Sequence, residues 1–100
     1  MVCLDVDYIR DLKLGVWERL EVARNPNTPP ETLTILARDK NSGVRWWVAR
    51  HNNTPPEILT ILARDKDWGV RYQVIHNPNS TREVIQTVRA YEFYKEHPTL

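Results

Sequence analysis

The sequence predicts an all-α protein, a short solenoid of about three two-helix repeats. The main observation is a segment that occurs twice, as TPPETLTILARDK from Thr28 and as TPPEILTILARDK from Thr54, which sets a repeat of 26 residues. A second pattern precedes each copy and returns a third time: ERLEVAR, VRWWVAR and VRYQVIH, starting at residues 18, 44 and 70. Both patterns place apolar residues at helical spacing, so each repeat is expected to contain two helices.

These repeats predict a single domain over residues 1–100. Full repeats are expected at residues 18–43, 44–69 and 70–95, with a tail at 96–100. Residues 1–17 are expected to form a partial opening repeat, because Val6, Ile9 and Leu12 form a helical stripe. Each unit buries its apolar side only against its neighbours, so both end units must be capped or must contact another molecule.

Helix starts are predicted from capping residues. We call the helices of the second pattern (ERLEVAR, VRWWVAR and VRYQVIH) VR-type helices. Asn41 and Asp67 stand where the N-caps of the second and third of them belong. Pro29 and Pro55 are expected at the first position of the following helices, where a missing N–H costs nothing. Three hydroxyl residues stand three positions before a glutamate, which is the spacing of a capping box: Thr28, Thr54 and Ser80.

The predicted core lies on the helices that follow these caps. Spacing of three and four residues brings the apolar positions to one face, and the small alanines allow a neighbouring repeat to approach closely. The positions are Leu33, Leu36 and Ala37, then Leu59, Leu62 and Ala63, and in weaker form Ile85 and Val88. The last helix is expected to continue to about Lys95.

Composition excludes several classes of function. Fourteen Lys and Arg residues against thirteen Asp and Glu residues give a net charge of +1, which provides no strong field for nucleic acid or an anionic membrane. No apolar run approaches the length of a membrane-spanning helix. Cys3 is the only cysteine, so no intramolecular disulfide can form, and a cytoplasmic location is expected.

The frame VRxxVAR-x-N-x-TPPE-x-L-x-x-LARD, over roughly residues 18–88, resembles the leucine-rich repeat variant family, a relative of the HEAT-like α-solenoids. The resemblance implies a right-handed superhelix in which short helices, partly 3₁₀, alternate with α-helices. Founding members also carry a cysteine cluster that holds an iron–sulfur centre. Such a centre needs several thiolates and this chain has one, so no cofactor is expected.

Resemblance to HEAT repeats further implies a ladder of ion pairs, in which an aspartate that closes one helix pairs with an arginine six residues later. Here Asp39 would pair with Arg45, and Asp65 with Arg71. Arg19 would lack a partner, because Lys13 stands six residues before it. These residues are therefore interpreted as structural.

The candidate site lies on the VR-type helices. Arg24, Arg50 and His76 end these helices without an evident acidic partner. Residues at the same position of successive repeats form a column. The column Leu20, Trp46, Tyr72 is apolar, which predicts that Trp46 packs between repeats. The column Glu21, Trp47, Gln73 mixes charged, aromatic and amide side chains, which predicts an exposed Trp47. Trp68, in a loop, is a further exposed candidate, and Arg38 and Arg64 are expected on a solvated face. The predicted partner-binding residues are Trp47, Arg50, Arg24, His76, Gln73 and Trp68.

These features favour a non-enzymatic module that binds another protein, because Trp and Arg dominate binding energetics. The alternative is DNA or RNA binding, with the Arg24, Arg50 and His76 column on phosphates and Trp47 stacked on a base. Neither catalysis nor a metal site is expected, since the histidines have no metal-ligand spacing and no nucleophile stands beside a base. The closing aromatics Tyr91, Phe93 and Tyr94 are either a cap or an oligomer interface.

Overall fold

The structure is a computed structural model, and it describes residues 14–96 of the chain. This part folds into six α-helices and contains no strand, which confirms the all-α class. The partial opening repeat and most of the tail, predicted at residues 1–17 and 96–100, lie largely outside the described residues. In chain order the helices are α2 (Val16–Arg24), α3 (Pro30–Leu36), α4 (Ser42–Arg50), α5 (Pro56–Leu62), α6 (Trp68–His76) and α7 (Arg82–Glu96).

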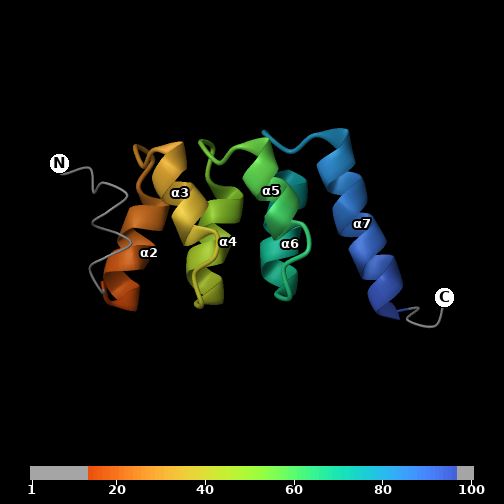
Figure 1. The fold of residues 1–100 in the computed structure, drawn as a ribbon, viewed down its shortest axis with the longest axis horizontal. Helices are drawn as coiled ribbons and strands as arrows, with labels where there is room; N and C mark the ends of the chain where they lie inside the picture. The colour runs from red at the N-terminus through yellow and green to blue at the C-terminus, as the bar shows by residue number, and fades with distance from the viewer. Residues whose placement is uncertain (1–13, 97–100) are drawn as a thin grey trace.

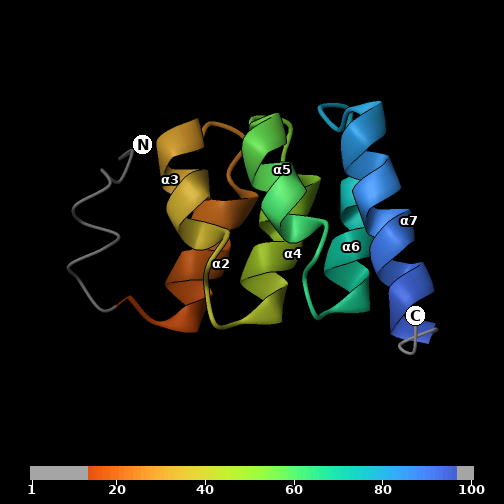
Figure 2. The same cartoon turned by 45° about the vertical axis from the view of Figure 1, so that its right-hand side comes forward.

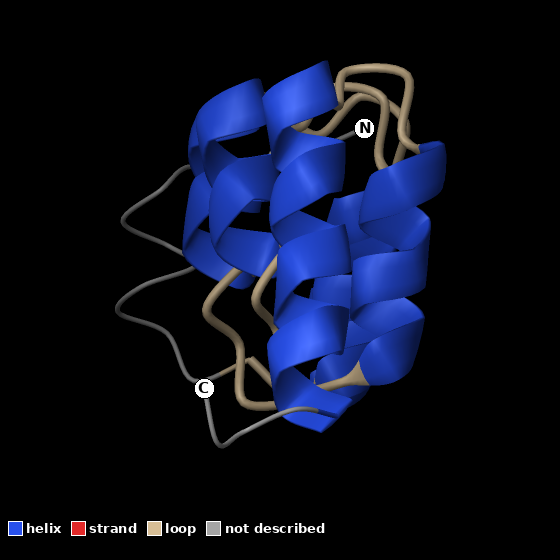
Figure 3. Cartoon of the chain, turned by 90° about the vertical axis from the view of Figure 1, so that its right-hand side faces the viewer, coloured by secondary structure: helices blue, strands red, loops and turns tan. Residues whose placement is uncertain are grey.

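The helices form two layers in a short solenoid (Figures 1 and 2). Helices α2, α4 and α6 pack side by side in one layer, and α3 and α5 cover them from the other side. Helix α7 closes the array by packing on both α5 and α6. The view along the array shows the helices of successive repeats aligned behind one another (Figure 3). Each repeat thus contacts its neighbours, as the sequence predicts.

The VR-type helices differ in one respect from the expectation drawn from the family. Helices α2, α4 and α6 are each nine residues long and α-helical throughout, so within residues 14–96 the prediction of partly 3₁₀ helices is wrong. The TPPE-type helices α3 and α5 are shorter, with seven residues each. Helices this short are unstable alone in water, so packing between repeats must hold them.

Two predicted N-caps are confirmed. The Asn41 side chain accepts a hydrogen bond from the backbone N–H of Val44 at 3.1 Å, and Asp67 accepts one from Val70 at 3.2 Å. Both bonds satisfy a donor that the first turn of a helix would otherwise leave unpaired.

The predicted capping boxes are wrong by one residue. Helix α3 begins at Pro30, and Pro29 is its N-cap, with an extended ψ of 158°. At α3 and α5 the second proline favours this start, because a residue that precedes proline is pushed out of the helical region. Helix α7 shows the same displacement without a proline pair, since Thr81 rather than Ser80 accepts from Val84 N–H, at 3.3 Å.

The three hydroxyls predicted as caps have another role, which is to connect each helix to the loop that follows it. Each donates to the carbonyl oxygen six residues earlier: Thr28 to Val22 at 2.5 Å, Thr54 to Val48 at 2.6 Å and Ser80 to Val74 at 2.5 Å. They thereby add a second bond to carbonyls in the last turns of α2, α4 and α6, which also accept the N–H of the residue that follows each helix.

A matched pair of threonines tests this role. Thr54 is fully buried with its hydroxyl bonded, whereas Thr32 is 1% exposed and its hydroxyl has no partner. Thr54→Val should lower the free energy of unfolding by about 1 to 2 kcal/mol, and Thr32→Val should raise it by about 1 kcal/mol. Urea denaturation followed by circular dichroism measures both. Equal shifts in the two variants would contradict the assignment of Thr54 as a bonded donor.

The predicted core is confirmed. All six leucine and alanine positions of α3, α5 and the residues that follow them are at most 4% exposed. They pack against valines from the other layer and from α7, and Ile85 is half-buried while Val84 takes its place. The valines are Val44, Val48, Val70, Val74, Val84 and Val88.

Amide side chains connect the loops of successive repeats, a feature that the sequence analysis missed. Two asparagines one repeat apart each donate from Nδ2 to two carbonyls of the preceding loop, at 2.6 to 3.2 Å: Asn53 to Pro26 and Thr28, and Asn79 to Asn52 and Thr54. His51 makes a similar link. Its Nδ1 accepts from Asn53 N–H at 3.0 Å, so its Nε2 carries the proton and donates to Asn25 O at 2.7 Å.

The arginine ladder exists, but the predicted pairing is wrong. Each carboxylate bonds the arginine 20 or 21 residues earlier in its own repeat: Arg19 Nε to Asp39 at 2.6 Å, Arg45 Nε to Asp65 at 2.7 Å, and Arg71 Nε to Glu92. Arg19, predicted to lack a partner, is therefore paired. The predicted six-residue contacts go to backbone instead, because Nη1 of Arg45 and of Arg71 bonds the carbonyl oxygen of Asp39 and of Asp65.

Candidate docking face

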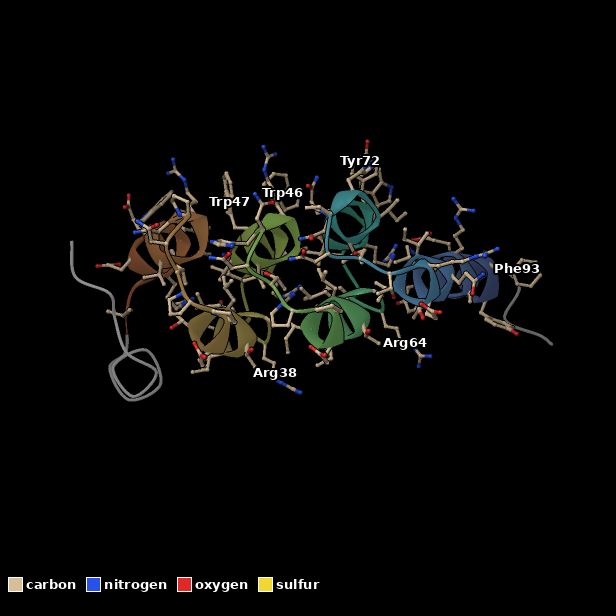
Figure 4. The ribbon with its side chains drawn as sticks, turned by 90° about the horizontal axis from the view of Figure 1, so that it is seen from above. Arg38, Trp46, Trp47, Arg64, Tyr72 and Phe93 are labelled. Atoms are coloured by element: carbon tan, nitrogen blue, oxygen red, sulfur yellow. The ribbon has the colours of Figure 1, made fainter. Side chains whose placement is uncertain are left out.

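The outer side of the α2, α4 and α6 layer carries a group of aromatic and cationic residues. Figure 4 shows Trp46, Trp47 and Tyr72 projecting from this side, opposite Arg38 and Arg64. Positions four apart on a helix share one face, which explains why the side chains line up. We call this surface the aromatic face and define it by seven residues: Arg24, Trp46, Trp47, Arg50, Trp68, Tyr72 and His76.

The two central tryptophans form one unit. Their rings meet edge to face, with centroids 5.0 Å apart, and both side chains are half-buried against the core. The predicted exposure of Trp47 is therefore wrong, because the neighbouring helix α2 covers part of its ring. Trp46 lies beside the start of α6, where a Cβ atom on Gly69 would be in ordinary contact with Cδ1 of Trp46, at 3.4 Å.

Two arginines stack on this tryptophan pair. The guanidinium carbon of Arg24, from the end of α2, lies 5.5 Å from the centroid of Trp47. That of Arg50, from the end of α4, lies 5.6 Å from the centroid of Trp46 and 5.7 Å from that of Trp47. These distances are within the range of cation–π attraction, which holds both guanidinium groups against the indoles.

Neither of these arginines forms an ion pair within residues 14–96, where the paired ones are Arg19, Arg45 and Arg71. Nor are Arg24 and Arg50 needed to satisfy the ends of their own helices. Those carbonyls already bind Thr28, Thr54 and Asn77, whose Nδ2 donates to Ala49 O at 2.7 Å. The guanidinium N–H groups therefore remain available to a ligand.

A depression opens between the ends of α2 and α4, beside these arginines. Its volume is about 270 Å³. The Trp47 ring and Ala23 give it an apolar wall, and the two guanidinium groups give it a cationic rim. It is lined by Ala23, Arg24, Pro26, Trp47, Arg50, His51 and Asn52.

Helix α6 carries a second aromatic group on the same face. Trp68 stacks on Tyr72 with centroids 5.5 Å apart, and Tyr72 contacts His76 at 4.5 Å. Trp68 is 64% exposed, as predicted, but its predicted place in a loop is wrong, because it is the first residue of α6 after the N-cap Asp67. Tyr72 is 48% exposed. His76 thus joins the α6 aromatics and not the arginines, while Gln73 is half-buried and contributes to neither set of ring contacts.

The closing aromatics separate into two kinds. The ring of Tyr91 lies 4.8 Å from the guanidinium carbon of Arg71, so this residue is part of the cap of the array. Phe93 and Tyr94 are 50% and 57% exposed at the far end of α7 (Figure 4). Tyr91 therefore fits the cap, and for Phe93 and Tyr94 the choice between a cap and an oligomer interface stays a prediction.

Residues 14–96 contain neither a metal-binding cluster nor a helix that could span a membrane. Residues 14–96 contain no cluster of three or more His, Cys, Asp or Glu residues that could hold a metal ion. None of their helices is long and apolar enough to cross a membrane. His51, at the depression, has both ring nitrogens bonded to the loops.

Comparison with known proteins places these repeats in a family. The family model described as leucine rich repeat variant matches residues 16–41 and 43–67. No curated protein and no solved structure was found to match the chain. The two matched segments correspond to the units α2 with α3 and α4 with α5, and together they cover half of the chain. The protein therefore belongs to the leucine rich repeat variant family, whose helical repeats are HEAT-like.

Proposed function

We propose that this protein is a non-enzymatic interaction module of the cytoplasm that binds a partner protein through its aromatic face. The observation that carries the proposal is the pair of guanidinium groups, Arg24 and Arg50, held on Trp47 beside a depression and bonded to no acid in residues 14–96. Trp and Arg are the residues most enriched at binding hot spots, especially beside pockets that exclude water.

The chemistry of the depression supports a binding role over a catalytic one. Its lining includes no serine, cysteine or carboxylate. The one titratable ring, His51, is 8% exposed, and hydrogen bonds to Asn25 and Asn53 hold both of its nitrogens. A general base must be able to reach the proton that it removes, so His51 is not suited to that role.

Nucleic acid is the less favoured ligand for the same face. Binding to a phosphate backbone needs successive cations, and this column has only two arginines, because its third member His76 contacts Tyr72. Exposed Glu18 and Glu21 on α2 would repel a strand that follows the array. The net charge of +1 adds no general attraction.

Affinity capture from an extract of the source organism tests the proposal. We expect a protein that binds the wild type and resists nuclease treatment to be lost with the double variant Arg50→Glu, Trp68→Ala. The matched control is Arg64→Glu, which makes the same charge change on an exposed residue of the opposite layer. If the Arg50→Glu, Trp68→Ala variant still captured the protein, or if nuclease treatment removed the captured material, a protein-binding role for this face would be contradicted.

A further inference from the structure

We propose that the depression between Arg24 and Arg50 binds the carboxylate side chains of an acidic segment of the partner, and that an apolar side chain of the same segment packs on Trp68 and Tyr72. This inference rests on the proposed function and specifies the chemistry of the partner. It follows from the charge of the rim, the state of the helix ends, and the aromatic residues one repeat away.

The rim of the depression carries two like charges, and no carboxylate of residues 14–96 forms an ion pair with either of them. Both guanidinium carbons lie within 6 Å of the Trp47 centroid, at 5.5 and 5.7 Å, and both residues line the same depression. A guanidinium presents N–H donors in a planar fork that matches the two oxygens of a carboxylate. An anion between Arg24 and Arg50 would bond both forks and would relieve their mutual repulsion.

The helix ends do not cancel this charge. Arg24 and Arg50 are the last residues of α2 and α4, where each helix carries a partial charge of about −0.5 on its terminal carbonyls. Hydrogen bonds from Thr28 and Thr54 already satisfy carbonyls of these last turns. Two whole positive charges therefore exceed the remaining partial charges, and the rim stays cationic.

The extent of the charged rim favours a short acidic segment over a polyanion. Cationic residues occupy the column on α2 and α4, but on α6 its member His76 faces Tyr72 at 4.5 Å. Exposed Glu21 lies one helical turn before Arg24 and sets a negative limit on the other side. One or two carboxylates fit between these limits, whereas a phosphate chain would extend past them.

The rest of the face requires an apolar group. Trp68 is 64% exposed and Tyr72 48% exposed, and their stacked rings form a shelf on the helix next to the tryptophan pair. Neighbouring packed helices lie about 8 to 10 Å apart, a distance that about three residues of an extended chain span. The segment should therefore carry an aliphatic or aromatic residue about three positions from its acidic one.

Selection from a random-peptide library displayed on phage tests this specificity without assuming a sequence. The library is selected on the wild type, on the double variant Arg24→Gln, Arg50→Gln, and on the matched control Arg38→Gln, Arg64→Gln. All four arginines are exposed, and the control pair lies on the opposite layer (Figure 4). Circular dichroism establishes that each variant keeps its helices.

We expect the wild type and the control to enrich peptides in which Asp or Glu stands near an apolar residue, and the aromatic-face variant to lose this enrichment. Replacing the acidic residue of a selected peptide by its amide should weaken binding by about tenfold or more, and so should each single Arg→Gln change on the rim. Arg50→Lys should retain only part of the affinity, because an ammonium lacks the planar fork.

The other outcomes separate this inference from the function beneath it. Enriched peptides that lack acids, or acidic peptides that bind the aromatic-face variant equally well, would overturn the carboxylate site and leave a protein-binding face in place. A single-stranded DNA probe that binds more tightly than every selected peptide, and fails to bind the aromatic-face variant, would replace the peptide by nucleic acid. No enrichment on the wild type would overturn both proposals.

Discussion

Arg71→Ala should lower the free energy of unfolding by about 3 to 5 kcal/mol, because this cation is buried and every remaining group around it would lose a partner. Arg71 is 1% exposed. It bonds Glu92 of α7 and the carbonyl oxygen of Asp65, and its guanidinium lies against Tyr91. One side chain thus connects α6 with the preceding loop and with the closing helix.

Urea denaturation followed by circular dichroism gives this free energy, and Arg64→Ala is the control for loss of an arginine as such, since Arg64 is exposed. Glu92→Gln should cost far less than Arg71→Ala, about 1 kcal/mol, because the Glu92 side chain is 45% exposed and water can replace part of the bond. A loss below about 1 kcal/mol for Arg71→Ala would contradict the view that the ladder anchors α7.

Leu62→Ala should lower the free energy of unfolding by about 2 to 5 kcal/mol through the lost burial and the cavity left behind. Leu62 is 1% exposed in the layer between the two rows of helices. A short solenoid has no second core to compensate, because each repeat is held only by its neighbours. Differential scanning calorimetry should therefore show a clearly lower Tm.

The adjacent residue provides a matched control for this change. Replacing Ile61 by alanine removes a side chain of the same size as Leu62 from the same helix, but Ile61 is 42% exposed. Ile61→Ala should therefore cost less than half as much as Leu62→Ala. Similar losses in the two variants would mean that the 26-residue register assigns the wrong face to the core.

The helices and the core could be predicted from the sequence because they follow from local spacing. Leu33, Leu36 and Ala37 recur at helical intervals and are buried, and Asn41 caps the helix that it precedes. The helix starts at Pro30 and Pro56 were misplaced by one position. The capping-box spacing does not show that the hydroxyls of Thr28 and Thr54 bond the preceding helix instead of capping the next one.

Contacts between distant parts of the chain could not be predicted in the same way, because they depend on how the helices of one repeat and of successive repeats pack. The pairing of Asp65 with Arg45, 20 residues earlier, lies within one repeat, whereas the predicted pair of Asp39 with Arg45 would join successive repeats. The half-buried position of Trp47 has the same origin, since Arg24 and Ala23 of the preceding repeat lie beside it. The unpaired state of Arg24 and Arg50 was visible in the sequence as a column without acids.

The most direct test of the docking face is a two-dimensional NMR titration of isotope-labelled protein with a selected acidic peptide. We expect the indole N–H signals of Trp46 and Trp47 and the guanidinium N–H signals of Arg24 and Arg50 to shift and saturate together. The guanidinium N–H signals of Arg38 and Arg64, which lie on the opposite layer, should remain unchanged. Shifts confined to α7 or to the layer of α3 and α5 would contradict the account and would place the binding surface elsewhere.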